Sequence, residues 1–401
     1  MYFATDWTKR VDFDAARQER ATRLRGLMER HRLDGILAFE AANIRYISGL
    51  RPLWVPNFGL MQAALITRTS PHVICWPFQD DTPHRQATMY WMDPQRVRPF
   101  PGVLDSPTPA PALEVLRQGL EELGLTSGHL GLDFTKVPVL DTLRDMLPDI
   151  EIVDGDVCLK EARQVKGLQE VEVMRQASEL VNIGFETALQ AVEPGMRECE
   201  VLAEVMHTFY QYGMEIPQCN LIVCSGSNTA PMQRFAGDRV IQRGDLVFMD
   251  LGGCWHGMFS EAARTVICGE PNEQQRQLYQ TVYNIHTQVI GAMKPGVTAA
   301  QLQQVAEQPY KASPFYGHMQ RMLIAHGIGM GFAEPPWVPP AGVPPPDLTL
   351  EVGMTLAVVI TILVPGIPGG GGVRLEDVVT VTPEGVEVMT GRIPYDEVLL
   401  S

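Results

Sequence analysis

A duplicated segment in the second half of the chain constrains the fold most strongly. Residues 188–209 (ALQAVEPGMRECEVLAEVMHTF) and 289–310 (VIGAMKPGVTAAQLQQVAEQPY) share one layout: a helix, a Pro-Gly turn and a second helix. The Pro-Gly pairs stand at 194–195 and 295–296, so the period is about 101 residues, and strand-like runs follow each copy. Because each copy is too small to bury its own apolar face, we expect the two to pack together about a pseudo-twofold axis. A crevice between them would receive residues from both halves.

The first part of the chain has a different pattern, in which short apolar runs alternate with helical periodicities. This alternation is typical of an α/β domain. A polar stretch over 158–170 leads into a long helix, and we place the boundary there, with domains at 1–160 and 161–401. The predicted fold class is therefore α/β (α+β). Strands are predicted over 34–39, 61–67, 72–76 and 130–134, helices over 13–33, 111–123, 139–147 and 167–192, and a turn over 43–50.

Four polar residues in glycine-rich surroundings are the candidate catalytic residues. Asp250 is predicted at the end of a strand, the glycines at 252, 253 and 257 predict a tight hairpin, and Glu261 follows on the returning strand. His326 stands in the sequence AHGIG, and Glu376 stands in VRLED. Carboxylates on paired strands can face one pocket, so we expect these four residues to form one site. Asp377 would point to the opposite face, and we expect it to be structural.

Grouped carboxylates repel one another, and a metal ion or a shared proton must relieve the repulsion. Without a metal, at least one of Glu261 and Glu376 should have a raised pKa, which gives a neutral acid beside an ionised base. Such a pair can activate water and protonate a leaving nitrogen. His326, whose ordinary pKa is about 6.5, can take either role.

Two arginines and two aromatic residues are the candidate substrate-binding residues. Arg374 and Arg264 can bind a substrate carboxylate or simply neutralise the acids. The segment 333–347 contains seven prolines and cannot form a helix or a central strand. It is either a rigid surface connector or a wall or lid over the site, to which Trp337 and the neighbouring Phe332 contribute.

Composition limits the partners and the compartment. The formal net charge of −15 disfavours nucleic acid and an anionic membrane surface as partners. The sequence has no apolar run long enough to span a bilayer and no signal-peptide pattern at its beginning. Seven cysteines without zinc-type spacing indicate reduced thiols. We therefore expect a cytoplasmic protein that acts on a small-molecule substrate.

The ordered motifs resemble one protein family. The Pro-Gly repeat, GDLVFMDLGG, SEAART, AHGIG and GMTLAVV…GGVRLEDVVTVT resemble the pita-bread superfamily of methionine aminopeptidase, prolidase, aminopeptidase P and creatinase. NIRYISG and the helix before it are similar to the smaller N-terminal domain of the two-domain members. The resemblance covers essentially the whole chain. It implies a creatinase-like N-terminal domain, a C-terminal pita-bread domain and a homodimer.

The departures from the family pattern concern its metal site. Peptidases of this family hold two metal ions through Asp, Asp, His, Glu and Glu. By this resemblance Asp250, Glu261, His326 and Glu376 match four of the ligands, with Glu261 in place of an aspartate. The remaining ligand position falls on Val359, which cannot bind a metal. Three family histidines that serve peptide cleavage fall on Met322, on Ala333, and on Met232 or Gln233.

The lost ligand and the three lost histidines argue against an ordinary prolidase, whereas creatinase shows that this fold can work without a metal by acid–base chemistry. The chain has no candidate for the catalytic histidine of creatinase, which argues against creatine itself as the substrate. A dimethylsulfoniopropionate lyase on the same fold shows that the scaffold is not confined to hydrolysis. The first hypothesis is therefore a metal-independent, creatinase-like hydrolase that cleaves a C–N bond of a small polar metabolite and needs no cofactor. The alternatives are a metal-dependent Xaa-Pro peptidase relative, with a single Mn, Zn, Fe or Co ion on Asp250, Glu261, His326 and Glu376, and a non-catalytic binding protein or lyase of this fold.

Overall fold

The computed structural model describes residues 11–52, 61–102, 110–218, 221–319 and 323–401. These residues form two compact units, one comprising Asp12–Arg163 and the other Gln164–Ser401. Both units combine helices with a β-sheet, which confirms the predicted α/β (α+β) class.

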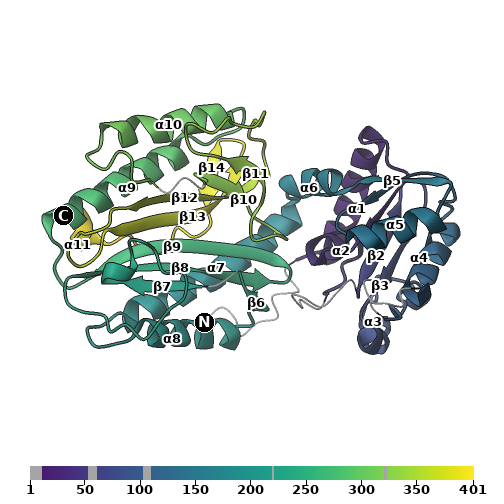
Figure 1. The fold of residues 1–401 in the computed structure, drawn as a ribbon, viewed down its shortest axis with the longest axis horizontal. Helices are drawn as coiled ribbons and strands as arrows, with labels where there is room; N and C mark the ends of the chain where they lie inside the picture. The colour runs from purple at the N-terminus through teal and green to yellow at the C-terminus, as the bar shows by residue number, and fades with distance from the viewer. Residues whose placement is uncertain (1–10, 53–60, 103–109, 219–220, 320–322) are drawn as a thin grey trace. The chain divides into compact units, whose positions relative to one another are not determined.

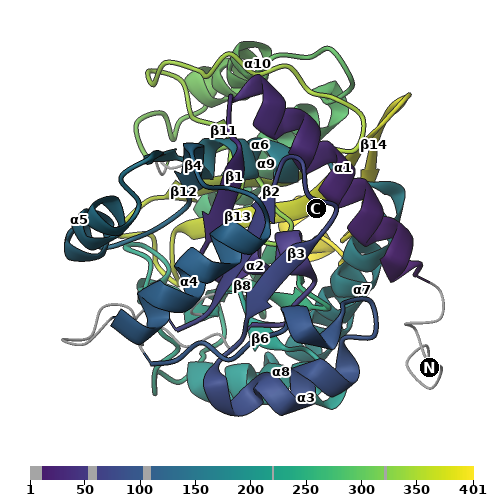
Figure 2. The same ribbon diagram turned by 90° about the vertical axis from the view of Figure 1, so that its right-hand side faces the viewer.

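The first unit is built on a mixed sheet whose described strands have the order β3-β2-β1-β4-β5 (Figures 1 and 2). β1 pairs antiparallel with β2 and parallel with β4, while β2–β3 is antiparallel and β4–β5 is parallel. The strands are β1 (Gly35–Ala38), β2 (Ala63–Thr67), β3 (Val73–Trp76), β4 (Gly128–Leu132) and β5 (Ile150–Asp154); the α-helices are α1 (Phe13–Arg30), α2 (Ala41–Ser48), α3 (Thr82–Thr88), α4 (Ala110–Glu122), α5 (Val137–Met146) and α6 (Asp156–Gln164).

The apolar stripe of α4 explains why this helix covers the sheet. Leu113, Leu116 and Leu120 recur at helical intervals, and they share one buried core with Leu37 of β1 and Trp76 of β3. Each buried leucine contributes about 1.5–3 kcal/mol relative to an exposed one. The alternation of strands and helices in the sequence therefore corresponds to helices packed on a sheet.

The stretch 43–50, predicted as a turn, instead forms most of α2. Ile44 and Ile47 are buried on one side of this helix, and Asn43 is buried as well. The helix ends at Gly49, whose φ of 73° is a left-handed conformation that glycine adopts without a steric penalty. An apolar pattern over eight residues is too short for its period to be read from sequence alone.

The second unit is built on an antiparallel sheet. Its described strands have the order β11-β10-β12-β13-β9-β8-β6, with β14 paired to β13 and β7 paired to β8. The strands are β6 (Ile216–Pro217), β7 (Ile222–Ser225), β8 (Asp245–Trp255), β9 (Met258–Cys268), β10 (Ala325–Gly327), β11 (Glu334–Val338), β12 (Thr355–Leu363), β13 (Gly372–Thr382) and β14 (Gly385–Val388); the α-helices are α7 (Leu168–Ala191), α8 (Glu198–Gln211), α9 (Glu273–Ala292), α10 (Ala299–Ala312) and α11 (Glu397–Leu400).

The sequence repeat corresponds to two helix pairs, α7–α8 and α9–α10, shown against the sheet in Figure 1. In each pair the Pro-Gly turn lies between the helices, and its glycine has a positive φ, 103° at Gly195 and 88° at Gly296. The first pair shares a buried core with Val247 and Met249 of β8, and the second shares one with Val358 of β12. Along β8 the side chains of Val247 and Met249 point to the face opposite that of Asp250, because successive residues of a strand alternate between faces. Along β12 the side chain of Val358 likewise points away from the face of Ala357 and Val359, which pair with His326 and Glu376. Both helix pairs therefore cover one face of the sheet and leave the candidate site on the other.

The hairpin between β8 and β9 differs in detail from the prediction. Its turn is His256–Gly257, where both residues have positive φ, 44° and 84°, as a two-residue hairpin turn of this hand requires. Gly252 and Gly253 lie within β8 instead, and Asp250 lies in the middle of that strand rather than at its end. A Cβ atom at 252 would come within 1.8 Å of Gln218 Oε1, so close packing requires glycine there.

No helix in the part of the chain that the structure describes is long and apolar enough to cross a membrane. The six cysteines in the described ranges are all free of disulfide bonds.

Candidate active site

The register of the neighbouring strands places the candidate residues on one face of the sheet. Side chains of directly paired residues point to the same face, and successive residues along a strand alternate between faces. Glu261 stands two residues before Ala263 and therefore shares its face. The direct cross-strand pairs that connect the site are Asp250 with Ala263, Ala263 with Glu376, Glu376 with Val359, and Ala357 with His326.

Three of the four predicted residues converge closely. One ligand atom from each of Glu261, His326 and Glu376 lies within 4.8 Å of the other two. His326 Nε2 is 3.3 Å from Glu261 Oε1 and 3.7 Å from Glu376 Oε1. All three side chains are at most about a tenth exposed. They form a compact group of one nitrogen donor and two carboxylates.

The orientation of His326 indicates that this group holds a cation or a proton between its three side chains. Its Nδ1 lies 3.0 Å from the backbone carbonyl oxygen of Gly327, an acceptor that fixes the ring proton on Nδ1. Nε2 then presents a lone pair toward two carboxylates, an arrangement that is repulsive unless a cation or a proton lies between them. Glu261 Oε1 is buried and has no hydrogen-bond partner among the described residues. A divalent cation would satisfy all three donors.

Asp250 is held by a different set of partners. Its Oδ2 accepts a short hydrogen bond from Arg374 Nη1, and its Oδ1 accepts one of 2.9 Å from Gln218 Nε2. Arg374 Nε donates in turn to Thr361 Oγ1 at 2.8 Å. Gln218 and Thr361 are site residues that the sequence patterns did not predict. Thr361 could have been found because it stands two residues after Val359 on the same strand face, whereas nothing in the sequence marks Gln218.

Burial and mutual repulsion raise the pKa values of two of the acids. Burial, followed by the nearby charges of Glu376 and Asp250, holds the pKa of Glu261 well above its usual range. Burial also raises the pKa of Asp250, although the guanidinium of Arg374 opposes the change. A metal-free site therefore favours a proton on Glu261, and a bound cation would displace it.

Arg264 does not reach this cluster, so its expected role in substrate binding is not supported by the structure. It is 1% exposed and lies on the helix-covered face, where Nη2 donates to Asp377 Oδ1 at 2.8 Å. Its Nη1 donates to the backbone carbonyl of Glu376 at 2.8 Å. Asp377 also accepts hydrogen bonds from Thr390 and Tyr395. This buried network fixes the strand that carries Glu376, and it gives Asp377 the structural position expected for it.

Trp337 and Phe332 flank the cluster, each more than a third exposed. Trp337 pairs directly with His326 across β10 and β11, and their ring centroids are 6.3 Å apart. The ring of Phe332 meets Phe259 edge-on at 6.4 Å. Part of the proline-rich segment forms β11, which lies at the end of the strand order, as its prolines require.

The positions where the resemblance expects a further ligand and three histidines carry neither a carboxylate nor a histidine. Val359 pairs directly with Glu376, so its apolar side chain points to the site face. Ala333 is partly buried, and Met232 and Gln233 lie in the loop between β7 and β8. Met322 lies outside the described residues.

The charge of the cluster matches one divalent ion. Three carboxylates (Asp250, Glu261 and Glu376) against one guanidinium (Arg374) give a formal charge of −2 when all four groups are ionised. One divalent cation would neutralise this charge. The residues present therefore fit one ion on Glu261, His326 and Glu376, and the fourth ligand proposed from sequence, Asp250, is bound to Arg374 instead.

Comparison with known families matches both units of the chain. Residues 172–383, just over half of the chain, match the model of metallopeptidase family M24, and residues 20–165 match the creatinase/prolidase N-terminal domain. An Xaa-Pro dipeptidase of Pyrococcus horikoshii is 26% identical over 93% of this chain and 97% of its own length. One from Pyrococcus furiosus is 32% identical over 59% of this chain and 65% of its own length. A solved Xaa-Pro dipeptidase from Bacillus anthracis superposes with a TM-score of 0.79 at 24% identity, covering 95% of this chain and 99% of that one.

These comparisons correct one prediction and confirm others. The expectation of a site that needs no cofactor is wrong, because the matching family is one of metallopeptidases and the similar proteins are prolidases. The loss of one ligand and three histidines had suggested otherwise, but three donors still converge. The predicted two-domain pita-bread resemblance and the predicted class, a hydrolase of a C–N bond, are confirmed. The chain belongs to metallopeptidase family M24, with a creatinase/prolidase-type domain preceding the M24 domain.

Proposed function

We propose that this protein is a metal-dependent peptidase that hydrolyses short peptides with proline in the second position, using one divalent ion held by Glu261, His326 and Glu376. The peptide class is that named for the similar Xaa-Pro dipeptidases. The observation that carries the proposal is the convergence of one imidazole nitrogen and two carboxylates within 4.8 Å, with a buried carboxylate oxygen that has no hydrogen-bond partner among the described residues.

The single ion distinguishes this proposal from the two-metal pattern of the family. Val359 supplies no ligand on the strand opposite Glu376, and Asp250 is already bound by Arg374 and Gln218. A second divalent ion would turn the formal charge of the cluster from neutral to positive and would have to displace the guanidinium. One ion is therefore the arrangement that these side chains stabilise.

The side chains divide the chemistry among them. When bound, a divalent ion supplies Lewis acidity that polarises a carbonyl and makes a water molecule more acidic. Glu261 and Glu376, both buried, are placed to accept a proton from that water and to return it to the leaving nitrogen. Arg374 keeps Asp250 in place beside them. Trp337 and Phe332 offer an apolar wall for the substrate side chain and the proline ring.

The test combines metal analysis with turnover. Protein purified without chelator should contain about one Mn, Fe, Co or Zn ion per chain by inductively coupled plasma mass spectrometry. It should hydrolyse dipeptides such as Ala-Pro, Leu-Pro and Met-Pro faster than Ala-Leu. Dialysis against a chelator should abolish the activity, and adding the ion back should restore it.

Two histidine variants provide the matched comparison. His326→Ala should lose the ion and at least about 100-fold in kcat/KM, because the ion carries the Lewis-acid chemistry. His318→Ala changes an exposed histidine outside the cluster and should retain both. Absence of metal after incubation with all four ions, or equal activity of the two variants, would refute the proposal. Ligand binding without turnover on any Xaa-Pro peptide would favour the non-catalytic alternative.

Homodimerisation and a cytoplasmic location remain predictions from the resemblance and the composition. Size-exclusion chromatography with light scattering tests the first, because the dimer would have twice the 44.5 kDa mass of one chain.

A further inference from the structure

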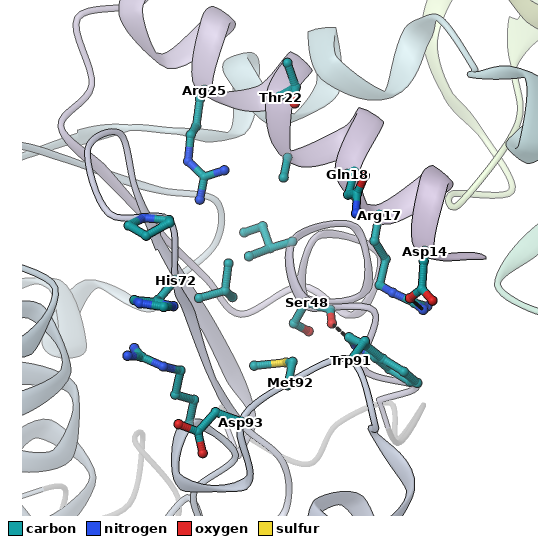
Figure 3. A pocket seen from close by; sticks show the side chains of 15 residues that line it. Asp14, Arg17, Gln18, Thr22, Arg25, Ser48, His72, Trp91, Met92 and Asp93 are labelled. Atoms are coloured by element: carbon teal, nitrogen blue, oxygen red, sulfur yellow. Dashed lines mark hydrogen bonds and ion pairs between the residues drawn. The ribbon is translucent and has the colours of Figure 1, made fainter. Parts of the chain in front are cut away.

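The N-terminal unit contains a cavity of about 670 Å³ that has no part in the site described above (Figure 3). Its volume lies within the range of small-molecule binding sites, about 300–1,000 Å³. α1 lines it with Arg17, Ala21 and Arg25 among others, and residues 71–73, 91–93 and 96 also line it. The cavity therefore belongs entirely to the unit Asp12–Arg163.

Most of the charged groups around this cavity are already paired. Arg17 forms a short ion pair with Asp14, and its guanidinium lies 4.1 Å from the ring centroid of Trp91. Arg96 pairs with Glu122 at 3.5 Å. Asp93 accepts a hydrogen bond from the backbone N–H of Gln95. One arginine of the cavity remains that has no carboxylate partner among the described residues.

That cation is Arg25. Among the described residues its guanidinium contacts no carboxylate, and the hydrogen bond it makes there runs from Nη2 to the backbone carbonyl of Ser70 at 2.9 Å. Its Nε is buried and has no hydrogen-bond partner within the described ranges. Burial lowers the pKa of Arg25, as expected for a cation that has lost water without gaining a counter-ion. In Figure 3 its guanidinium extends from α1 into the cavity, on the same side as His72.

Part of the remaining lining is apolar and lies beside polar side chains that include Asp14 and Asp93. Ile47, Val73 and Met92 contribute aliphatic and thioether surface, and Ile47 is buried. Trp91 adds an aromatic ring that is fixed in place, because its Nε1 donates to the backbone carbonyl of Ser48 at 3.0 Å. The cavity thus combines a partly apolar lining with one cation that has no carboxylate partner among the described residues, which suits a molecule with one anionic end and an apolar body.

We propose that this cavity is a second ligand site, which binds a small organic anion whose carboxylate or phosphate pairs with Arg25 and whose apolar part lies against Ile47, Val73 and Met92. Guanidinium groups bind both oxyanions through parallel N–H···O bonds, so the geometry of Arg25 suits either. The site is built from residues of the unit Asp12–Arg163 alone, and the proposal does not depend on the function proposed for the peptidase cluster.

The test is a ligand-observed NMR titration of the full-length protein with benzoate and with phenyl phosphate. Benzamide, a neutral analogue of similar shape, and acetate, which lacks the ring, serve as control ligands. We expect benzoate or phenyl phosphate to bind at least tenfold more tightly than either control, and the stronger of the two identifies the preferred oxyanion. Arg25→Gln should weaken that binding roughly 10–100-fold, the usual consequence of removing a charge-assisted hydrogen bond.

Two further variants make the result specific to this cavity. Arg144→Gln removes an arginine of α5 that pairs only loosely, at 3.7 Å, with Asp141, and it should leave binding unchanged. Ala21→Phe keeps Arg25 but fills part of the cavity, and it should abolish binding even if Arg25→Gln proves unstable in thermal melts. No binding of either anion to the wild-type protein, or equal binding to the wild type and both cavity variants, would overturn the proposal.

Discussion

Glu261 and Val359 are the two residues at which this site departs from the family pattern. Glu261 stands where the resemblance expects an aspartate, and its longer side chain ends in an oxygen, Oε1, that is buried without a hydrogen bond from the described residues. Val359 stands on the site face, opposite Glu376, where the family has a ligand. The first departure keeps the negative charge and lengthens the side chain that carries it, whereas the second removes one carboxylate from the buried site.

Once the pH exceeds its raised pKa in the folded state, the carboxylate of Glu261 should destabilise the metal-free protein. Its folded-state pKa is raised by burial and by the neighbouring carboxylates, so the folded state binds this proton more tightly than the unfolded state. The resulting destabilisation is present above the folded-state pKa and disappears as the pH falls through it. Glu261→Gln should therefore raise the free energy of unfolding of chelator-treated protein at pH 8 by about 1–3 kcal/mol. The gain should shrink toward pH 5, and denaturant unfolding at both pH values measures it.

The same variant, which should gain stability without metal, should lose metal content and activity. Glu261→Gln should lose the ion, because an amide is a poorer ligand than a carboxylate, and with it the peptidase activity. A variant that is less stable than the wild type at pH 8, or one that still holds the ion, would contradict this interpretation of Glu261.

The position of Val359 predicts a gain of metal capacity. Val359→Glu places a carboxylate on the site face beside Glu376, and it should raise the stoichiometry from about one to about two ions per chain at saturating metal. Val359→Gln has the same shape without the charge and should stay at one. Calorimetric titration of chelator-treated protein distinguishes them, and a wild-type stoichiometry of two would show that Val359 does not limit the site.

At the scale of elements, the long hairpin of β8 and β9 positions the site. Its register faces Asp250 and Glu261 the same way, while Met249 and Arg264 face the helix-covered side. Gly252 allows Gln218 to approach Asp250, because a side chain there would collide with Gln218 and with the backbone oxygen of Ser260 at 2.4 Å. Gly252, one of the three glycines predicted to form the turn, thus serves close packing beside the site.

Two glycine-to-alanine substitutions should have opposite effects on stability. Gly252→Ala introduces a Cβ in contact with backbone atoms that cannot move freely, and it should destabilise the protein by roughly 2 kcal/mol or more. Gly291→Ala on α9 has no atom within 4 Å of its new Cβ, and it should stabilise the protein by about 0.5–1 kcal/mol through helix propensity. Thermal and denaturant unfolding of both variants provides the comparison. Equal effects would refute the packing role given to Gly252.

At the scale of the whole molecule, all the proposed metal ligands come from the unit Gln164–Ser401. A ligand that binds only the folded state stabilises that state by about 2.7 kcal/mol when present at 100 times its Kd. The unit Asp12–Arg163 has its own apolar core and contributes none of these ligands. Metal binding should therefore stabilise the two units unequally.

Differential scanning calorimetry with and without chelator checks this expectation. Removing the ion should lower the Tm of the transition that belongs to the metal-binding unit by several degrees and leave the other transition nearly unchanged. His326→Ala without chelator should reproduce the effect. A single transition that moves as a whole, or no change in either, would contradict independent stabilisation of the metal-binding unit.

The sequence by itself determined the repeat, the fold class and the convergence of acids with a histidine. These follow from local patterns: Pro-Gly turns at a fixed spacing, apolar runs whose side chains alternate, and glycine-flanked polar residues at strand positions. The spacing of Asp250 and Glu261 on a hairpin was enough to predict that both face one side. The resemblance also places the missing ligand at Val359, and this residue lies on the site face opposite Glu376.

Only the tertiary structure decided which charged groups pair. Arg264 and Arg374 look equivalent in sequence, but strand register sends Arg264 to Asp377 on one face and Arg374 to Asp250 on the other. Gln218 and Thr361 join the site through contacts between strands distant in sequence, which no local pattern records. The expectation of a cofactor-free site failed for the same reason. Lost ligands can be counted from sequence, but whether the remaining donors still converge depends on how the strands pair.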